Sequence, residues 1–197
     1  MIIGPKYKIA RRLGAPIFEK TQTQKYALRQ ERKGRKQGFS KPKSEFGIQL
    51  NEKQKARFVY GMSERQFSNY VKEALLKKTS NSSQTIFGFL EKRLDNVVYR
   101  LGFGKTRPQA RQMVSHRHVM VNGKKINIPS YTVGEGDKIT ITPKFQNEEI
   151  KARLEEGVEV PEFVTRQDLE GKLVRLPTRE DVSNPVNYQL VIEFYSR

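Results

Sequence analysis

The sequence predicts an α+β fold: a mostly helical domain with an inserted small module of two helices packed on a short antiparallel sheet, preceded by a basic N-terminal extension. Three observations carry this prediction. Apolar residues recur at helical spacing before residue 102, an Asn-Gly pair marks a β-hairpin after it, and the net charge changes along the chain. We expect the extension at residues 1–45, the helical domain at 46–89 completed by 146–197, and the module at 90–145.

The charge of the chain favours a polyanionic partner. The 197 residues include 38 Lys and Arg against 21 Asp and Glu, a net charge of +17. Basic residues exceed acidic ones by 13 to 3 in residues 1–45 and by 11 to 4 in residues 90–145, but residues 146–197 hold 7 basic and 11 acidic ones. Phosphate groups are the natural ligands of such an excess. Residues 1–45 and 90–145 should therefore form the surface that contacts the phosphates.

The first 45 residues are rich in charge and offer few positions for a hydrophobic core. Gly34, Gly38 and Pro42 interrupt any helix in the second basic cluster. Two interpretations remain open for this segment. It is either a solvated, disordered tail or an arm that becomes ordered on nucleic acid.

The following segment has the pattern of two helices. Residues 53–60 favour a helix that ends at Gly61, and Ser63 with Gln66 three residues later forms a capping box for the next one. One face of this second helix should be buried through Phe67, Tyr70, Val71, Ala74 and Leu75. Asn81-Ser82-Ser83 breaks the pattern and marks a domain boundary.

Two more helices should open the module. An apolar stripe, Leu90, Leu94, Val97, Val98 and Leu101, predicts one amphipathic helix from about residue 86 to residue 101, with Arg93 on another face. Thr106 and Gln109 then predict a capped helix that turns Met113 and Val114 inward and Arg107 and Arg111 outward.

The rest of the module reads as antiparallel strands. Residues 119–121 and 124–126 flank Asn122-Gly123, which favours a type I′ turn, and residues 138–142 alternate as a strand does. The tail then offers a short helix over residues 150–156, a largely irregular acidic stretch, and an apolar run at 190–195 that should pack into a core.

Residues that would support catalysis or hold a metal are scarce. The sequence has neither a phosphate-binding loop nor a dinucleotide-binding glycine motif. Ser115 and His116 are adjacent in the sequence, but adjacency alone is not evidence of a catalytic triad. There is no Cys, and His116 and His118 flank the positive Arg117, so we expect neither a metal site nor any cofactor. No stretch approaches the roughly 20 apolar residues of a membrane span, so we expect no membrane partner.

Several motifs resemble a known family. Residues 91–102 (EKRLDNVVYRLG), Thr106-Arg107, Gln109-Ala110-Arg111-Gln112, Val114-Ser115-His116 and Val121-Asn122-Gly123 resemble the RNA-binding module of the bacterial-type ribosomal protein S4 family. The flanking motifs at residues 46–50, 52–55, 60–61 and 64–67, and the ending at residues 191–197, are similar to that family too. The resemblance covers roughly residues 4–197.

The resemblance implies a structural constituent of the small ribosomal subunit that is not an enzyme. It implies binding to a multi-helix junction in the five-prime domain of small-subunit ribosomal RNA, early in assembly. Its partners would be messenger RNA, near the channel through which it enters, and neighbouring proteins, especially ribosomal protein S5. The resemblance implies that the protein lies in the cytoplasm, with an organellar ribosome as the alternative. Many members carry a Cys-rich zinc knuckle, so residues 17–38, lacking Cys, must do without metal.

The family's RNA contacts carry over to matching positions. On the module they fall on Arg93, Arg107, Gln109, Arg111, Gln112, Ser115, His116, Lys124 and Lys125. On the helical segment they fall on Lys53, Lys55, Arg57 and Arg65, and on the extension we add Arg11, Arg12, Arg35, Lys36, Lys41 and Lys43. Arg and Lys would anchor phosphates, while Gln, Ser and His would hydrogen-bond sugars or base edges.

Two other classes of function compete with a structural ribosomal protein. A free RNA chaperone or translational regulator would need the same RNA-binding surface. An RNA-modifying enzyme carrying the same module would need an active-site carboxylate motif in a separate domain, and the sequence shows none.

Overall fold

A computed structural model describes residues 3–34, 43–77 and 81–197 of the chain. It divides the chain into two compact units, residues 1–83 with 185–197 and residues 84–184. The α+β class is confirmed, because helices accompany an antiparallel sheet in the strand order β2-β1-β3-β5-β4.

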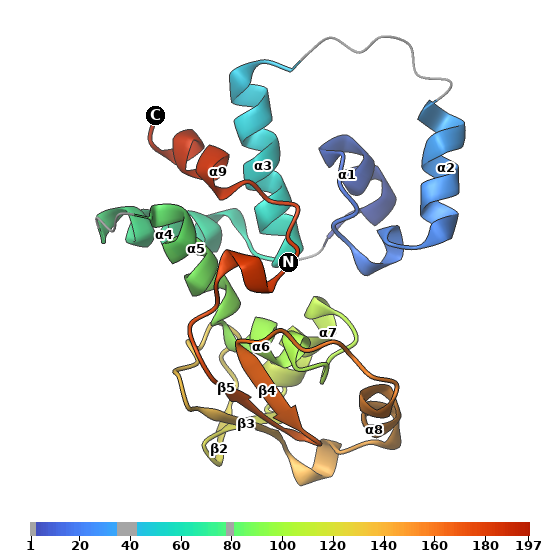
Figure 1. Cartoon of the computed structure of the whole chain (residues 1–197), viewed down its shortest axis with the longest axis vertical. Helices are drawn as coiled ribbons and strands as arrows, with labels where there is room; N and C mark the ends of the chain where they lie inside the picture. The colour runs from blue at the N-terminus through green and yellow to red at the C-terminus, as the bar shows by residue number, and fades with distance from the viewer. Residues whose placement is uncertain (1–2, 35–42, 78–80) are drawn as a thin grey trace. The chain divides into compact units, whose positions relative to one another are not determined.

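The first unit is helical. Its elements are α1 (Lys6–Leu13), the 3₁₀ turn η1 (Glu19–Thr21), α2 (Gln24–Gly34), α3 (Glu45–Val59), α4 (Glu64–Leu76) and α9 (Tyr188–Tyr195). Figure 1 shows α9 running alongside α3, and the hydroxyls of Tyr60 and Tyr188 lie 3.1 Å apart. The apolar run near the C-terminus is thus a helix in this core, and the expected cap of α4 is confirmed because Ser63 Oγ accepts a hydrogen bond from the Gln66 amide.

The N-terminal segment does more than extend the chain. Ile9, Ala10 and Leu13 on α1 are buried, and the ring of Phe18 meets that of Phe58 on α3 edge-on at 6.3 Å. The expectation of few core positions in residues 1–45 is therefore wrong for residues 3–34, whose sparse apolar residues converge on one helix. Arg35, Lys36 and Lys41 lie outside the described residues.

The second unit packs helices against the sheet (Figure 1). Helix α5 (Ser82–Glu91) starts at its border; within it follow α6 (Leu94–Arg100), α7 (Arg107–Ser115), β1 (Val119–Val121), β2 (Lys124–Ile126), β3 (Lys138–Ile141), η2 (Pro143–Phe145), α8 (Glu148–Glu155), β4 (Val164–Gln167), β5 (Glu170–Leu173) and η3 (Arg179–Asp181). One face of the sheet packs into the core that α6 and α7 share, through the buried side chains of Val119, Val121, Ile139 and Ile141.

The single helix expected from residue 86 to residue 101 is broken. Helix α5 ends at Glu91 and α6 begins at Leu94, because the next backbone amides bond to a distant loop. The Leu94 amide donates to the Tyr131 carbonyl at 2.8 Å and the Asp95 amide to the Pro129 carbonyl at 3.1 Å. These long-range hydrogen bonds leave the apolar stripe intact but interrupt the backbone.

The boundary expected at residue 145 also differs from the structure. Residues 146–184 belong to the compact unit of the module rather than to the helical domain. Strand β5 pairs with β3 through Gly171 and Ile139, while Phe163 and Leu173 are buried in the module's core. The stretch expected to be irregular therefore adds two strands, β5 and β4, to the three that precede it in the sheet.

Candidate RNA interface

Helix α7 carries most of the predicted contacts of the module. Thr106 Oγ1 accepts a hydrogen bond from the Gln109 amide at 3.3 Å, and Gln109 Oε1 accepts one from the Lys105 amide at 2.7 Å. The cap that the sequence predicted is therefore present, and it engages part of the Gln109 side chain. Met113 and Val114 are buried as expected.

Arg107 is held in place by α6. Its Nε donates to Asn96 Oδ1 at 3.1 Å, and its guanidinium lies over the Tyr99 ring, 4.3 Å from the centroid. Asn96 in turn donates to the fully buried Glu91 carboxylate at 2.7 Å, and Arg100 pairs with that carboxylate at 2.9 Å. The buried acid thus fixes the amide that orients Arg107.

Arg111, one turn further along, faces Asp95, the acid in the first turn of α6. Its Nη1 lies 3.5 Å from Asp95 Oδ2, and Arg93 contacts the same carboxylate at 2.6 Å. Arg93 is only 1% exposed, so its expected place on a surface face is wrong: the break before α6 turns it inward onto Asp95. Arg93 thus holds Asp95 in place from inside the module, while Arg111 stays about one-third exposed.

The end of α7 presents open polar groups. Gln112, Ser115 and His116 are exposed, and Ser115 Oγ donates to the Arg111 carbonyl at 2.9 Å. Two residues that the sequence interpretation passed over join them. Lys105 and Arg117 are exposed at the two ends of α7, and neither forms an ion pair with the part of the chain that is described. Their place at the ends of a basic helix was the available signal.

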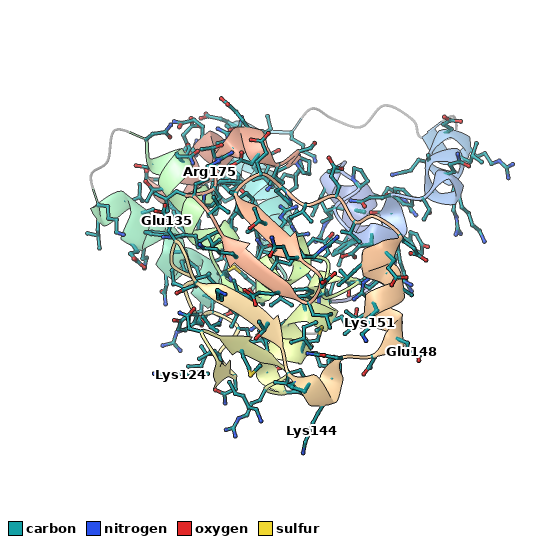
Figure 2. The ribbon with its side chains drawn as sticks, turned by 60° about the horizontal axis from the view of Figure 1, so that its bottom comes forward. Lys124, Glu135, Lys144, Glu148, Lys151 and Arg175 are labelled. Atoms are coloured by element: carbon teal, nitrogen blue, oxygen red, sulfur yellow. The ribbon has the colours of Figure 1, made fainter. Side chains whose placement is uncertain are left out.

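The hairpin has the geometry that its sequence predicted. Asn122 and Gly123 both have positive φ, 49° and 77°, as a type I′ turn requires. Lys124 pairs across the strands with the buried Val121, whereas Lys125 pairs with Met120. Because side chains alternate along a strand, Lys124 lies on the helix-covered face of the sheet and Lys125 on the opposite face. Both are exposed at the β2 edge, where Figure 2 shows Lys124 projecting from the ribbon.

Three candidates of the first unit are engaged inside the protein. Lys53 is 7% exposed and pairs with Glu64 at 2.8 Å, and its ammonium lies 4.4 Å from the Phe194 ring centroid. Lys55 pairs with Glu52 at 2.6 Å, and Arg57 lies 3.8 Å from Glu64. The charges of these three residues, which were expected to contact RNA, are therefore paired with acids inside the protein. Among the remaining candidates of this unit, Arg12, Lys43 and Arg65 are exposed and Arg11 is half-buried.

Glu64 organises this cluster. Burial by itself would raise the pKa of its carboxyl, but hydrogen bonds from Lys53 and Tyr195 and the positive charges nearby lower the pKa below its usual value. The same burial and the neighbouring Glu64 charge raise the pKa of the Tyr195 hydroxyl. The cluster joins α3, α4 and α9 and is structural in character.

The structure also bears on metal binding and on membrane insertion. The described residues hold no group of three or more His, Cys, Asp or Glu side chains placed to bind a metal ion. Across the same residues, no helix combines the length and the apolar character needed to cross a membrane.

A small α+β unit with oriented arginines and open lysines on one helix and one hairpin defines the class of an RNA-binding module. The comparisons with known proteins agree. The S4 domain family matches residues 92–139, and the family of the ribosomal protein S4/S9 N-terminal domain matches residues 1–91. The small ribosomal subunit protein uS4 of Natranaerobius thermophilus is 42% identical over 208 residues, which cover 98% of this chain and 98% of that protein.

The chain therefore belongs to the ribosomal protein S4 family, whose members are structural, RNA-binding constituents of the small ribosomal subunit. This confirms the resemblance seen in the sequence. It also excludes an RNA-modifying enzyme that merely carries the same module, because the family is not enzymatic.

Proposed function

We propose that this protein binds a multi-helix junction in the five-prime domain of small-subunit ribosomal RNA early in assembly. The observation that carries the proposal is the orientation of Arg107 and Arg111 by Asn96 and Asp95 on the neighbouring helix. Arginines fixed before binding lose little freedom on contact, so they favour a rigid RNA surface of matching shape. A-form RNA hides its major groove, so such recognition reads shape and backbone.

The contacts on the module divide by role. Arg107, Arg111, Lys105 and Arg117 meet phosphates along α7, and the predicted Gln109, Gln112, Ser115 and His116 meet sugars or base edges. Lys124 supports the same side from the hairpin, since it lies on the helix-covered face of the sheet. Lys125 points to the other face and contributes only through long-range charge, which salt screens over about 10 Å.

The protein's neighbours follow from the same proposal. The bound protein lies near the channel through which messenger RNA enters, beside ribosomal protein S5, in the cytoplasmic ribosome. Residues 146–184 carry ten acidic and six basic side chains, which supports a protein rather than RNA as the neighbour of that part of the module.

Reconstitution with ribosomal RNA fragments tests the proposal. We expect the protein to bind an isolated five-prime domain fragment and to stay with assembled small subunits through a high-salt wash. Equal binding to fragments of the other domains would contradict the assignment to the five-prime domain. Release in the wash would favour a free RNA chaperone or translational regulator.

The hairpin lysines supply a matched pair for this experiment. Each phosphate contact contributes about 0.7–0.9 to the slope of log affinity against log salt. Lys124→Ala should reduce the slope by about that amount, and Lys125→Ala should change it much less. The reverse order would place the RNA on the other face of the sheet.

A further inference from the structure

Three aromatic rings form a stepped row just beyond α7. The rings of His116 and His118 lie 5.9 Å apart at 46°, and those of His118 and Phe145 lie 3.9 Å apart and nearly parallel, at 5°. The row runs from the end of α7 to η2. Phe145 and the neighbouring Lys144 lie beyond residues 92–139, the part of the chain that the S4 domain family matches.

The stacked pair is held by the ends of two paired strands. The His118 amide donates to the Met113 carbonyl at 2.9 Å, and the His118 carbonyl accepts from the Thr142 amide at 2.9 Å. The Phe145 amide donates to the Thr142 carbonyl at 2.8 Å, and the Phe145 ring packs against the hydrophobic core. The core therefore supports Phe145, and Phe145 holds the imidazole of His118 flat.

The surroundings of this pair suit a nucleotide. His118 is half-buried, and its ring makes no hydrogen bond to any residue that the structure describes. Arg117 and Lys144 are exposed, each immediately preceding one ring of the pair in the sequence, and Figure 2 shows Lys144 projecting away from the ribbon. Neither cation pairs with an acidic side chain among the described residues. A fixed ring flanked by unneutralised cations combines the two elements of single-strand binding, a stacking surface and phosphate contacts.

We propose that an unpaired base of the ribosomal RNA junction stacks on the face of the His118 ring that Phe145 does not cover, with Arg117 and Lys144 contacting the flanking phosphates. The inference deepens the proposed function and rests on it. An unpaired nucleotide is the occupant, since bases within an A-form helix are stacked on one another and cannot reach a side-chain ring. Phe145 acts as a positioning residue, because it contacts the imidazole and not the RNA.

Equilibrium binding of the full chain to the five-prime domain fragment, measured at several salt concentrations, tests this inference. His118→Ala should weaken binding by about 5- to 100-fold, the range that loss of one stacked base produces. The salt slope should stay unchanged, because stacking releases no counterions. Lys144→Ala should instead lower the slope by about 0.7–0.9, and Lys151→Ala, an exposed lysine of α8, should leave it unchanged.

Abasic substitution of the RNA identifies the base. One unpaired position, made abasic, should weaken wild-type binding by the same factor as His118→Ala, and should weaken binding of His118→Ala no further. His118→Phe should retain affinity because it keeps a flat ring on Phe145, which separates stacking from an effect on folding.

The outcomes distinguish the two proposals. If wild-type protein prefers the junction fragment over a plain duplex but His118→Ala binds as tightly as wild type, the stacking inference is wrong and the proposed function stands. If no abasic position couples to His118, the inference is equally contradicted. If wild type binds duplex and junction alike, the proposed function itself fails.

Discussion

Gly171 on β5 lies directly against Leu101 at the end of α6. A Cβ added at Gly171 would come within 2.3 Å of Leu101 Cδ1, and Arg166 on the adjacent strand donates a 2.8 Å hydrogen bond to the Leu101 carbonyl. The sheet therefore packs against the end of α6, the helix that carries Asp95 and Asn96. The orientation of the arginines on α7 depends on this contact through α6.

We predict that Gly171→Ala destabilises the module by about 1–3 kcal/mol, since the added methyl must displace Leu101 or β5 in a packed core. Unfolding by urea measures the change. Gly88→Ala is the control, because nothing lies within 4 Å of a Cβ added there and the residue is inside α5. That variant should be about 0.5–1 kcal/mol more stable. Equal stability of Gly171→Ala and wild type would contradict the close contact.

Arg111 is tied to the fold as well as open to RNA. The sequence predicted that Arg111 faces outward, where a charge reversal would change stability little, but the structure places Arg111 beside the buried Asp95. Arg111→Glu should therefore destabilise the protein by about 1–2 kcal/mol through like-charge repulsion, while Arg111→Gln should cost less. Both should weaken RNA binding. An unchanged melting temperature in Arg111→Glu would show that the contact with Asp95 contributes nothing.

Val114→Ala provides the opposite case on the same helix. Val114 is fully buried, so its truncation should cost about 1–3 kcal/mol by leaving a cavity. RNA affinity should fall only as far as the module unfolds. Loss of affinity at a temperature where the variant is fully folded would mean that the inward and outward faces of α7 are assigned the wrong way round.

Stability at acid pH should report on Glu64. Its pKa is lowered in the folded protein from the usual 4.5, so its contribution is present above that value and is lost as pH falls through the folded-state pKa. The free energy of unfolding of Glu64→Gln should therefore differ from that of wild type more at pH 7 than at pH 3. Glu73→Gln, on the exposed side of the same helix, is the control. A Glu64→Gln difference that is the same at both pH values would rule out this linkage.

Chelation should have no effect on folding. The chain has no Cys, and the described residues offer no cluster suited to a metal. The melting temperature in magnesium-free buffer should be the same with and without EDTA. A drop of several degrees would reveal a metal that stabilises the folded state.

Local signals in the sequence were sufficient for the elements that depend on neighbouring residues. Thr106 with Gln109 predicted the start of α7, and Asn122-Gly123 predicted the hairpin, because caps and tight turns are determined within a few residues. The apolar stripe through Leu94 and Leu101 predicted the buried face correctly. It did not predict the break before α6, which depends on carbonyls some 35 residues away.

Long-range pairing accounts for the rest. Strands β4 and β5 are four residues each, and β5 finds its partner β3 across an intervening helix, so no local pattern identifies them. Likewise, helical spacing placed Arg93 on an outward face, and the family resemblance placed Lys53 among the RNA contacts. Lys53 is buried because folding brings Glu64 next to it. Arg93 is buried because the break in the helix turns it toward Asp95.

The most direct test of the account compares binding to the five-prime domain junction with binding to a plain RNA duplex across a salt titration. The oriented arginines predict a clear preference for the junction, and the charge of +17 predicts a steep dependence on salt. If about 6–10 phosphates are contacted, affinity should fall by about 10³–10⁵ between 50 and 200 mM salt. Equal affinity for the two RNAs at every salt concentration would contradict the central claim that this surface recognises the shape of a junction.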